Sequence, residues 1–215
     1  MESWKRKLRM GMVGGGQGAF IGGVHRMAAT LDQQVELVAG CFSQSYENTK
    51  VTGAQLYLDP ARCYRGYEVM AAEEAKLPSD KRIDFVSIVT PNVSHFPIAK
   101  TFLNAGFHVV CDKPMTYSLA EAEELTQLVE KTGLVFAVTY NYTGHALVRH
   151  ARGLFRSGAM GKVRKVVVVP ARFSHGVARE ARPEASRVAP GSGTIGARRP
   201  PSATSAPIAS TSWNM

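Results

Sequence analysis

A glycine-rich segment near the start of the sequence could hold the phosphates of a nucleotide. Residues 14–19 read Gly-Gly-Gly-Gln-Gly-Ala and fit the pattern G-x-G-x-x-G/A. In this pattern we expect Gly14 to make a tight turn, Gly16 to let the backbone approach a pyrophosphate, and Ala19 to let helix and strand pack closely. The pyrophosphate would lie at the N terminus of the next helix, where free N–H groups favour an anion. The alternative is a flexible glycine loop without a ligand. The predicted cofactor-binding residues here are Gly14, Gly16, Gln17, Gly18, Ala19 and Phe20.

The end of the second apolar run bears on which dinucleotide would bind. A carboxylate there accepts hydrogen bonds from the ribose hydroxyls of NAD, whereas an arginine neutralises the 2′-phosphate of NADP. The run ends instead in Ser43-Gln44-Ser45. We expect Ser43 to lie at the cofactor, and the cofactor to be either NAD or NADP.

Polar residues follow three later apolar runs of the sequence. The first group is Thr90, Pro91, Asn92 and His95, the second is Asp112, Lys113 and Pro114, and the third is Asn141 with Tyr142; the two prolines are the apolar members. A lysine held by a following proline at the end of a strand is a hydrogen-bond donor with a fixed direction, which favours a functional role for Lys113 over a solvated turn. His95 lies near a helix start, where it could contact a cofactor or simply cap or pack. Asn141 and Tyr142 could be ordinary loop residues.

Together with the glycine-rich loop, these residues resemble the N-terminal domain of the Gfo/Idh/MocA family, the glucose-fructose oxidoreductases and inositol dehydrogenases. The similarity covers about residues 8–170. It implies that Asp112-Lys113-Pro114 stands for the family's E-K-P motif, with Asp in place of Glu and a proline that commonly follows a cis peptide bond. It also implies a catalytic Lys113 that hydrogen-bonds the reacting hydroxyl and the nicotinamide ribose. Further implied cofactor contacts are Thr90, Pro91, Asn92, His95, Asp112 and Pro114, and implied substrate contacts are Asn141 and Tyr142.

The resemblance implies an NAD(P)-dependent oxidoreductase that moves hydride between nicotinamide and a hydroxyl or carbonyl of a polyol, cyclitol or sugar. The alternative is a nucleotide-binding fragment without catalysis, because the family's D-x-G-x-H motif is absent from the sequence as written. The activity of this chain alone is therefore left open. A homo-oligomer is expected for full-length family members and is doubtful here.

Strands and helices must alternate to position these residues. From residue 8 to about 169, short apolar runs alternate with helical segments, a pattern typical of strand-helix-strand units around a parallel sheet. Expected strands span 8–13, 35–42, 83–89, 108–111, 134–139 and 163–169. Pro97 and Gly106 indicate a helix over 98–105, and a capping box of Ser118 with Glu121 indicates a helix over 119–131. The predicted class is α/β, a Rossmann-like doubly wound parallel sheet with only the start of a second α+β domain and a disordered tail.

Composition and charge exclude several classes of protein. The chain of 215 residues is 45% hydrophobic and has a net charge of +9. Most of this charge lies in residues 1–10 (+3) and 171–215 (+4), so the body lacks the basic stripe of a nucleic-acid binder. No apolar run approaches the 20 or so residues that span a membrane. Three cysteines without a C-x-x-C pair suit a reducing, cytoplasmic location, and the six histidines show no metal-ligand spacing.

The composition changes after Pro170. Residues 171–215 are dominated by Ala, Arg, Pro, Ser, Gly and Thr and contain no Asp or Lys, which predicts a disordered tail. In another reading frame, codons for 203–208 permit Asp-Ile-Gly-Thr-His, which fits D-x-G-x-H. We therefore interpret the tail as out of frame, through a natural or sequencing frameshift. The predicted divisions are a basic arm (1–7), a Rossmann domain (8–140), the start of a substrate domain (141–170) and the tail (171–215).

Overall fold

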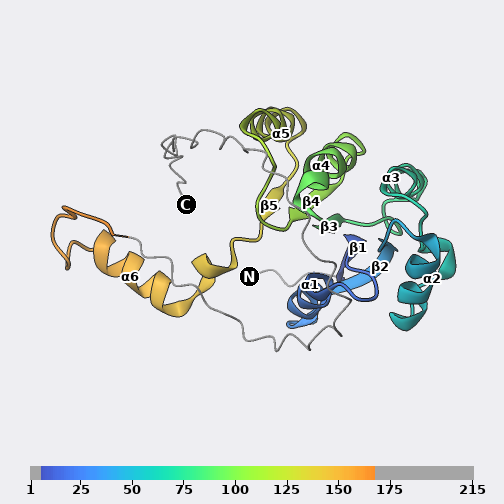
Figure 1. The fold of residues 1–215 in the computed structure, drawn as a ribbon, viewed down its shortest axis with the longest axis horizontal. Coiled ribbons are helices and arrows are strands. Elements are labelled where there is room, and N and C mark those ends of the chain that lie inside the picture. Colours follow the sequence, from blue (N-terminus) through green and yellow to red (C-terminus); the bar gives the residue numbers. More distant parts are fainter. Residues whose placement is uncertain (1–5, 168–215) are drawn as a thin grey trace, which may run out of the picture. The chain divides into compact units, whose positions relative to one another are not determined.

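Five parallel strands form one sheet in the part of the chain that the computed structural model describes, residues 6–167 (Figure 1). The strands are β1 (Leu8–Gly14), β2 (Val35–Cys41), β3 (Phe85–Val89), β4 (His108–Cys111) and β5 (Phe136–Val138). Their order in the sheet is β2-β1-β3-β4-β5, and all four pairings are parallel. The predicted α/β class with a doubly wound parallel sheet is confirmed for these residues.

Among residues 6–167, five helices connect the strands and lie on both faces of the sheet, and a sixth follows β5. They are α1 (Phe20–Thr30), α2 (Tyr46–Gln55), α3 (Tyr67–Lys76), α4 (His95–Asn104), α5 (Leu119–Thr132) and α6 (Ala146–Arg156), with 3-10 turns η1 (Pro60–Arg62), η2 (Asn92–Ser94) and η3 (Asn141–Gly144). The chain steps from β1 to β2 and then back across β1 to β3. Because crossovers between parallel strands are right-handed, these opposite steps put α1 on one face and α2 and α3 on the other. Figure 1 shows α4 and α5 on the side of the sheet opposite α1.

The two helices with the clearest sequence signals form: α5 lies within one residue of the expected 119–131, and α4 begins three residues before the expected 98–105. The Ser118 side chain accepts a hydrogen bond from the Glu121 N–H, and the Glu121 carboxylate accepts one from the Ser118 N–H. This capping box satisfies two N–H groups at the start of α5, which ends at a left-handed Gly133. Helix α4 carries Pro97 in its first turn and is followed by Gly106 with a φ of 84°.

One predicted strand does not form in the described part of the chain. Residues 163–167 of the strand expected at 163–169 have no regular structure, and 168–169 lie outside the described residues. A strand needs a neighbour to satisfy its backbone hydrogen bonds, and the described sheet consists of β1 to β5 alone. The predicted basic arm is described only from residue 6, and the predicted tail at 171–215 lies outside the described residues.

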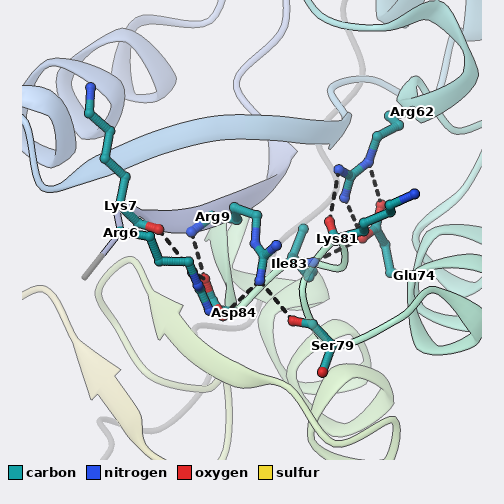
Figure 2. A network of polar contacts seen from close by, with 9 residues as sticks. All are labelled: Arg6, Lys7, Arg9, Arg62, Glu74, Ser79, Lys81, Ile83 and Asp84. Carbon is teal, nitrogen blue, oxygen red and sulfur yellow. Dashed lines mark hydrogen bonds and ion pairs between the residues drawn. The ribbon is translucent and has the colours of Figure 1, made fainter. Parts of the chain in front are cut away.

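Strands β1 and β3 begin at a shared carboxylate (Figure 2). Asp84, directly before β3, accepts a hydrogen bond of 2.7 Å from the Arg9 N–H of β1 and two, of 2.7 and 2.8 Å, from the Arg6 guanidinium. Burial alone raises the pKa of Asp84, but the hydrogen bonds and positive charges of Arg6 and Arg9 outweigh it and lower the pKa to about 2. Asp84 therefore stays ionised and fixes the start of both strands.

A second carboxylate ties α3 to the same end of the sheet. Glu74 is fully buried. Its carboxylate accepts hydrogen bonds from Arg62 Nε at 3.0 Å, from the Tyr64 hydroxyl at 2.8 Å and from the Ile83 N–H at 3.0 Å. Figure 2 shows Arg62 reaching both Glu74 and the carbonyl of Lys81. A buried charge is tolerated only when it is paired and hydrogen-bonded, and Glu74 meets both conditions.

Candidate functional site

The glycine-rich loop adopts a conformation that side chains would block. Gly14, Gly15 and Gly18 have φ values of 87°, 74° and 86°, in the left-handed region. The Gly16 N–H donates to the carbonyl of Phe42 at 3.0 Å, and a Cβ on Gly16 would lie only 2.9 Å from that oxygen. Glycine at position 16 is therefore needed for the loop to pack against the end of β2.

The close contact between loop and helix falls at a residue other than the expected one. A Cβ on Gly22 would lie 2.3 Å from the Cα of Gly15, and a Cβ on Gly15 would lie 2.7 Å from the Cα of Gly22. Ala19, to which the sequence pattern assigned this packing, is exposed and precedes the first residue of α1. The packing role expected of Ala19 therefore belongs to Gly22, because the loop runs three residues farther before the helix meets the strand.

The start of α1 has the features of an anion site. Ala19 makes no side-chain capping hydrogen bond, and the first turn of α1 carries no acidic residue. Gly18 borders open space, since a Cβ there would meet nothing within 4 Å. The Phe20 side chain is 84% exposed beside it. Helix N–H groups without side-chain partners, a favourable dipole and free space together fit the pyrophosphate of a dinucleotide.

The loop is held on its other side by α2. The Gln17 N–H donates to Asn48 Oδ1 and to Thr52 Oγ1, each at 3.0 Å. Gln17 therefore fixes the loop through its backbone, while its side chain is left to face solvent or a ligand. Residues Asn48 and Thr52 were not anticipated from the sequence, because their role depends on the packing of α2 against the loop.

Ser43 lies at the end of β2, where a dinucleotide ribose is expected. Its N–H donates to Thr49 Oγ1 at 3.1 Å, and its hydroxyl accepts from the Ser45 N–H at 3.1 Å. The guanidinium of Arg65 stacks 4.1 Å from the ring centre of Tyr46, the first residue of α2. This cation was not anticipated from the sequence, because Arg65 lies 20 positions after Ser45. The hydroxyls and the cation are compatible with NAD and with NADP.

The two loops after β3 and β4 are joined by His95. Its side chain is fully buried, with Nδ1 2.7 Å from the Pro114 carbonyl and Nε2 2.9 Å from the Thr90 carbonyl. A direct contact between His95 and the cofactor is therefore not supported, since the ring is enclosed and both nitrogens already have partners. Pro91 and Asn92, in the same loop as Thr90, are exposed.

Asp112 orients the segment that carries Lys113. Asp112 Oδ1 accepts hydrogen bonds from the Lys113 N–H at 2.9 Å and from Thr139 Oγ1 at 3.0 Å. The Lys113–Pro114 peptide bond is cis. The Lys113 side chain is exposed and makes no hydrogen bond or ion pair with another described residue. Its ammonium group is thus available to a ligand at the end of β4.

A hollow of about 730 Å³ opens beside Lys113. Its wall includes Asp112, Lys113, Asn141 and Tyr142, so the structure brings the predicted catalytic and substrate-contacting residues to one place. Pro91 and Asn92 are not part of this wall. Much of the floor is apolar and comes from α1 and from the sheet. It extends to Met10, Val35 and Phe85 near the starts of β1, β2 and β3, so the hollow runs along the face of the sheet to its carboxyl end.

His25 of α1 also lines the hollow and was missed from the sequence. Its Nδ1 lies 3.1 Å from Ser87 Oγ, and its Nε2 lies 3.7 Å from Asp112 Oδ1. Burial lowers the pKa of His25, against the opposing charge of Asp112. The available signal was the helical spacing of Ile21, His25 and Ala28, which puts the histidine on the face of α1 that meets the sheet.

Three further findings concern the described residues only. None of their helices is long and apolar enough to cross a bilayer. No group of three or more His, Cys, Asp or Glu side chains among them is arranged to hold a metal ion. Cys41, Cys63 and Cys111 are all buried and free of disulfide bonds.

A doubly wound parallel sheet with a glycine-rich turn between β1 and α1 defines a dinucleotide-binding Rossmann domain. Residues 8–140 match the sequence model of the Gfo/Idh/MocA oxidoreductase family, described as having an NAD-binding Rossmann fold. The chain belongs to this family.

Relatives and solved structures agree with this assignment. The uncharacterized oxidoreductase YfiI of Bacillus subtilis (strain 168) is 40% identical over 172 residues, which are 80% of this chain and 42% of the relative. An oxidoreductase structure from Sinorhizobium meliloti is 48% identical, with a TM-score of 0.70 over 74% of this chain and 44% of that one. An inositol dehydrogenase homolog from Azotobacter vinelandii, complexed with NADH and myo-inositol, is 42% identical, with a TM-score of 0.72 over 74% and 42%. The chain thus spans less than half the length of these proteins.

Proposed function

We propose that the protein acts as an NAD(P)-dependent oxidoreductase on a hydroxyl-bearing carbon of a polyol or sugar. The observation that carries the proposal is the position of Lys113 at the end of β4, in the wall of the hollow and at the same edge of the sheet as the glycine-rich loop. In open parallel sheets, ligands bind in the crevice outside the carboxyl ends of the strands. A dinucleotide anchored at the loop would reach along this edge.

The chain's own residues bind and orient in this proposal. The start of α1, with Gly18 and Ala19, holds the pyrophosphate, and Ser43 faces the ribose next to the adenine. The residues Thr90, Pro91 and Asn92, in the loop after β3, line the cofactor cleft near Gly14, whose Cβ would lie 2.9 Å from Thr90 Cγ2. When bound, the nicotinamide supplies the carbon that accepts or returns hydride.

Lys113 would hold the reacting oxygen. Its ammonium group has three donors and no acceptor, so it hydrogen-bonds the substrate hydroxyl but does not itself take up the hydroxyl proton. Asp112 keeps the backbone of Lys113 in place through the 2.9 Å hydrogen bond from the Lys113 N–H. In the resembled family a D-x-G-x-H histidine accepts the proton. The sequence as written has no such motif, so in this chain the hydroxyl proton would pass to solvent water, at a cost in rate.

The proposed substrate class rests on the polar groups at the hollow. Asn141 and Tyr142 present an amide and a phenol beside Lys113, groups that both donate to and accept from hydroxyls. The 42% identical homolog binds myo-inositol together with NADH. We include in the proposal that residues 8–140 form the cofactor domain and that 141–170 begin the substrate domain.

The direct test follows deuterium. The chain is incubated with NAD⁺ or NADP⁺ and myo-inositol deuterated at its ring carbons, and the reduced cofactor is analysed by mass spectrometry. We expect deuterium in the nicotinamide, with a rate about a hundredfold lower in Lys113→Met, as is typical when one positioned donor is lost. Lys131→Met, on α5, is the matched control and should retain the rate. Absence of transfer from myo-inositol and other polyols or sugars would overturn the proposed activity.

A further inference from the structure

His95 links two loops that lie at the cofactor-binding edge of the sheet. The side chain is fully buried. Its Nδ1 is 2.7 Å from the carbonyl oxygen of Pro114, in the loop after β4, and its Nε2 is 2.9 Å from the carbonyl oxygen of Thr90, in the loop after β3. Both distances are those of well-formed hydrogen bonds.

The identity of the two partners fixes the number of protons on the ring. A carbonyl oxygen can only accept, so each ring nitrogen of His95 must donate to form both hydrogen bonds. A neutral imidazole has a single N–H, and its other nitrogen would direct a lone pair at a carbonyl oxygen less than 3 Å away. Only the imidazolium, with an N–H on each nitrogen, satisfies both contacts.

The surroundings of the His95 ring include some features that oppose a positive charge and others that favour it. Burial and a position at the N terminus of α4 act against a cation. Two hydrogen bonds from a charged donor to carbonyl dipoles in a dry environment act in its favour, and such bonds are short and strong. Among the described residues, no carboxylate lies within 4.0 Å of either nitrogen of His95. The two carbonyl oxygens are therefore the groups that stabilise the charge.

We propose that His95 is a doubly protonated, buried imidazolium that clamps the loop after β3 to the loop after β4 and so positions Lys113. Pro114 directly follows Lys113, so the hydrogen bond to the Pro114 carbonyl fixes the backbone next to the catalytic ammonium group. His95 is thus a positioning residue that touches neither cofactor nor substrate. Its charge state is independent of the proposed function, whereas its effect on cofactor binding rests on that function.

Nuclear magnetic resonance of the imidazole nitrogens tests the charge state directly. The full chain is labelled with ¹⁵N at histidine, and correlations between ring nitrogens and ring protons are recorded at neutral pH. We expect His95 to show an N–H on both nitrogens, assigned by their disappearance in His95→Gln. A ring with one protonated and one bare nitrogen would overturn the proposal. The result does not depend on a folded variant, because the ring signals of His95 can also be assigned in the native chain by through-bond correlations to its own backbone.

Cofactor titration tests the positioning role. His95→Gln keeps one donor and His95→Phe keeps none, so we expect the Kd for NADH to rise about tenfold in the first variant and further in the second. His108→Gln is the control, because His108 accepts a hydrogen bond from the Val135 N–H at the opposite end of β4. Unchanged affinity in both His95 variants would overturn the positioning role. If the native chain itself binds no NADH, the proposed function fails while the result for the ring nitrogens stands.

Discussion

Asp112 contacts three residues that come from different parts of the candidate site. It holds the backbone of Lys113 and the hydroxyl of Thr139, and it faces His25 across 3.7 Å. A carboxylate in this place explains why the lysine segment keeps one orientation although the Lys113 side chain is exposed. Asp112, where the family resemblance implies a glutamate, therefore has partners that fix it.

The stability of the protein should fall on mild acidification because of His25. Burial lowers its pKa below the ordinary value of about 6.5, so below that pH the unfolded chain binds more protons than the folded one. The contribution is complete above about pH 6.5 and is lost as the pH falls through the lowered pKa. Urea unfolding at about pH 7.5 and about pH 5 should show a smaller loss of unfolding free energy in His25→Gln than in the native chain. His150→Gln, on the exposed α6, serves as control, and an equal loss in all three proteins would contradict the prediction.

The three cysteines should be inert in the folded protein. Burial, helped by nearby carboxylates, raises the pKa of Cys41 to about 11 and that of Cys111 to about 12, and burial also raises the pKa of Cys63. Because the thiolate is the reactive form, iodoacetamide at neutral pH should leave all three unlabelled in the native state and label all three in urea. Rapid labelling of the native chain would show that these thiols are not enclosed.

At the scale of elements, α3 depends on the buried carboxylate of Glu74. Replacing Arg62 by Met leaves this charge without its cation and should lower the free energy of unfolding by about 3 kcal/mol. Lys76→Met removes the exposed ion pair with Glu73 on the same helix and should cost about 0.5 kcal/mol or less. Both values can be measured by urea denaturation. Equal effects of the two substitutions would mean that the buried pair contributes no more than a surface pair.

Sequence patterns predicted the elements well where the signal is local. The alternation of apolar runs and helices, the capping box of α5 and the glycine that follows α4 all depend on neighbouring residues. No strand forms over residues 163–167, because a strand also needs a partner, which no local pattern provides. Gly22 was missed for a related reason, since the pattern G-x-G-x-x-G/A already fitted Ala19 and the true packing contact depends on how far the loop runs.

The site residues also divide into those that the sequence indicated and those whose role depends on contacts across the fold. The glycine loop was predicted from residue type and position, and the roles of Lys113, Asn141 and Tyr142 came from the family resemblance. The structure places Lys113, Asn141 and Tyr142 around one hollow. His25 and Arg65 could not be predicted, because their significance comes from contacts across the fold. The burial of His95 could not be predicted for the same reason.

At the scale of the whole molecule, one topology brings these features together. The strand order β2-β1-β3-β4-β5 places the loops after β1, β3 and β4 at the carboxyl edge of the sheet. The carboxylates Asp84 and Glu74 brace the opposite end, where β1 and β3 begin. The glycine-rich loop, the Thr90 loop and the Lys113 segment therefore share one edge. This division between a braced end and a binding edge supports our central claim that the chain holds a dinucleotide at α1.

Calorimetric titration of the 215-residue chain with NADH and with NADPH tests this claim most directly. We predict saturable binding of at least one of them. Phe20→Glu puts a carboxylate in the first turn of α1, where it favours the helix but repels a pyrophosphate, and should raise the Kd about tenfold or more without loss of unfolding free energy. Leu31→Glu adds the same charge at the other end of α1, where the side chain is 82% exposed, and should bind like the native chain. Failure of the native chain to bind either nucleotide, or undiminished binding by Phe20→Glu, would contradict the claim.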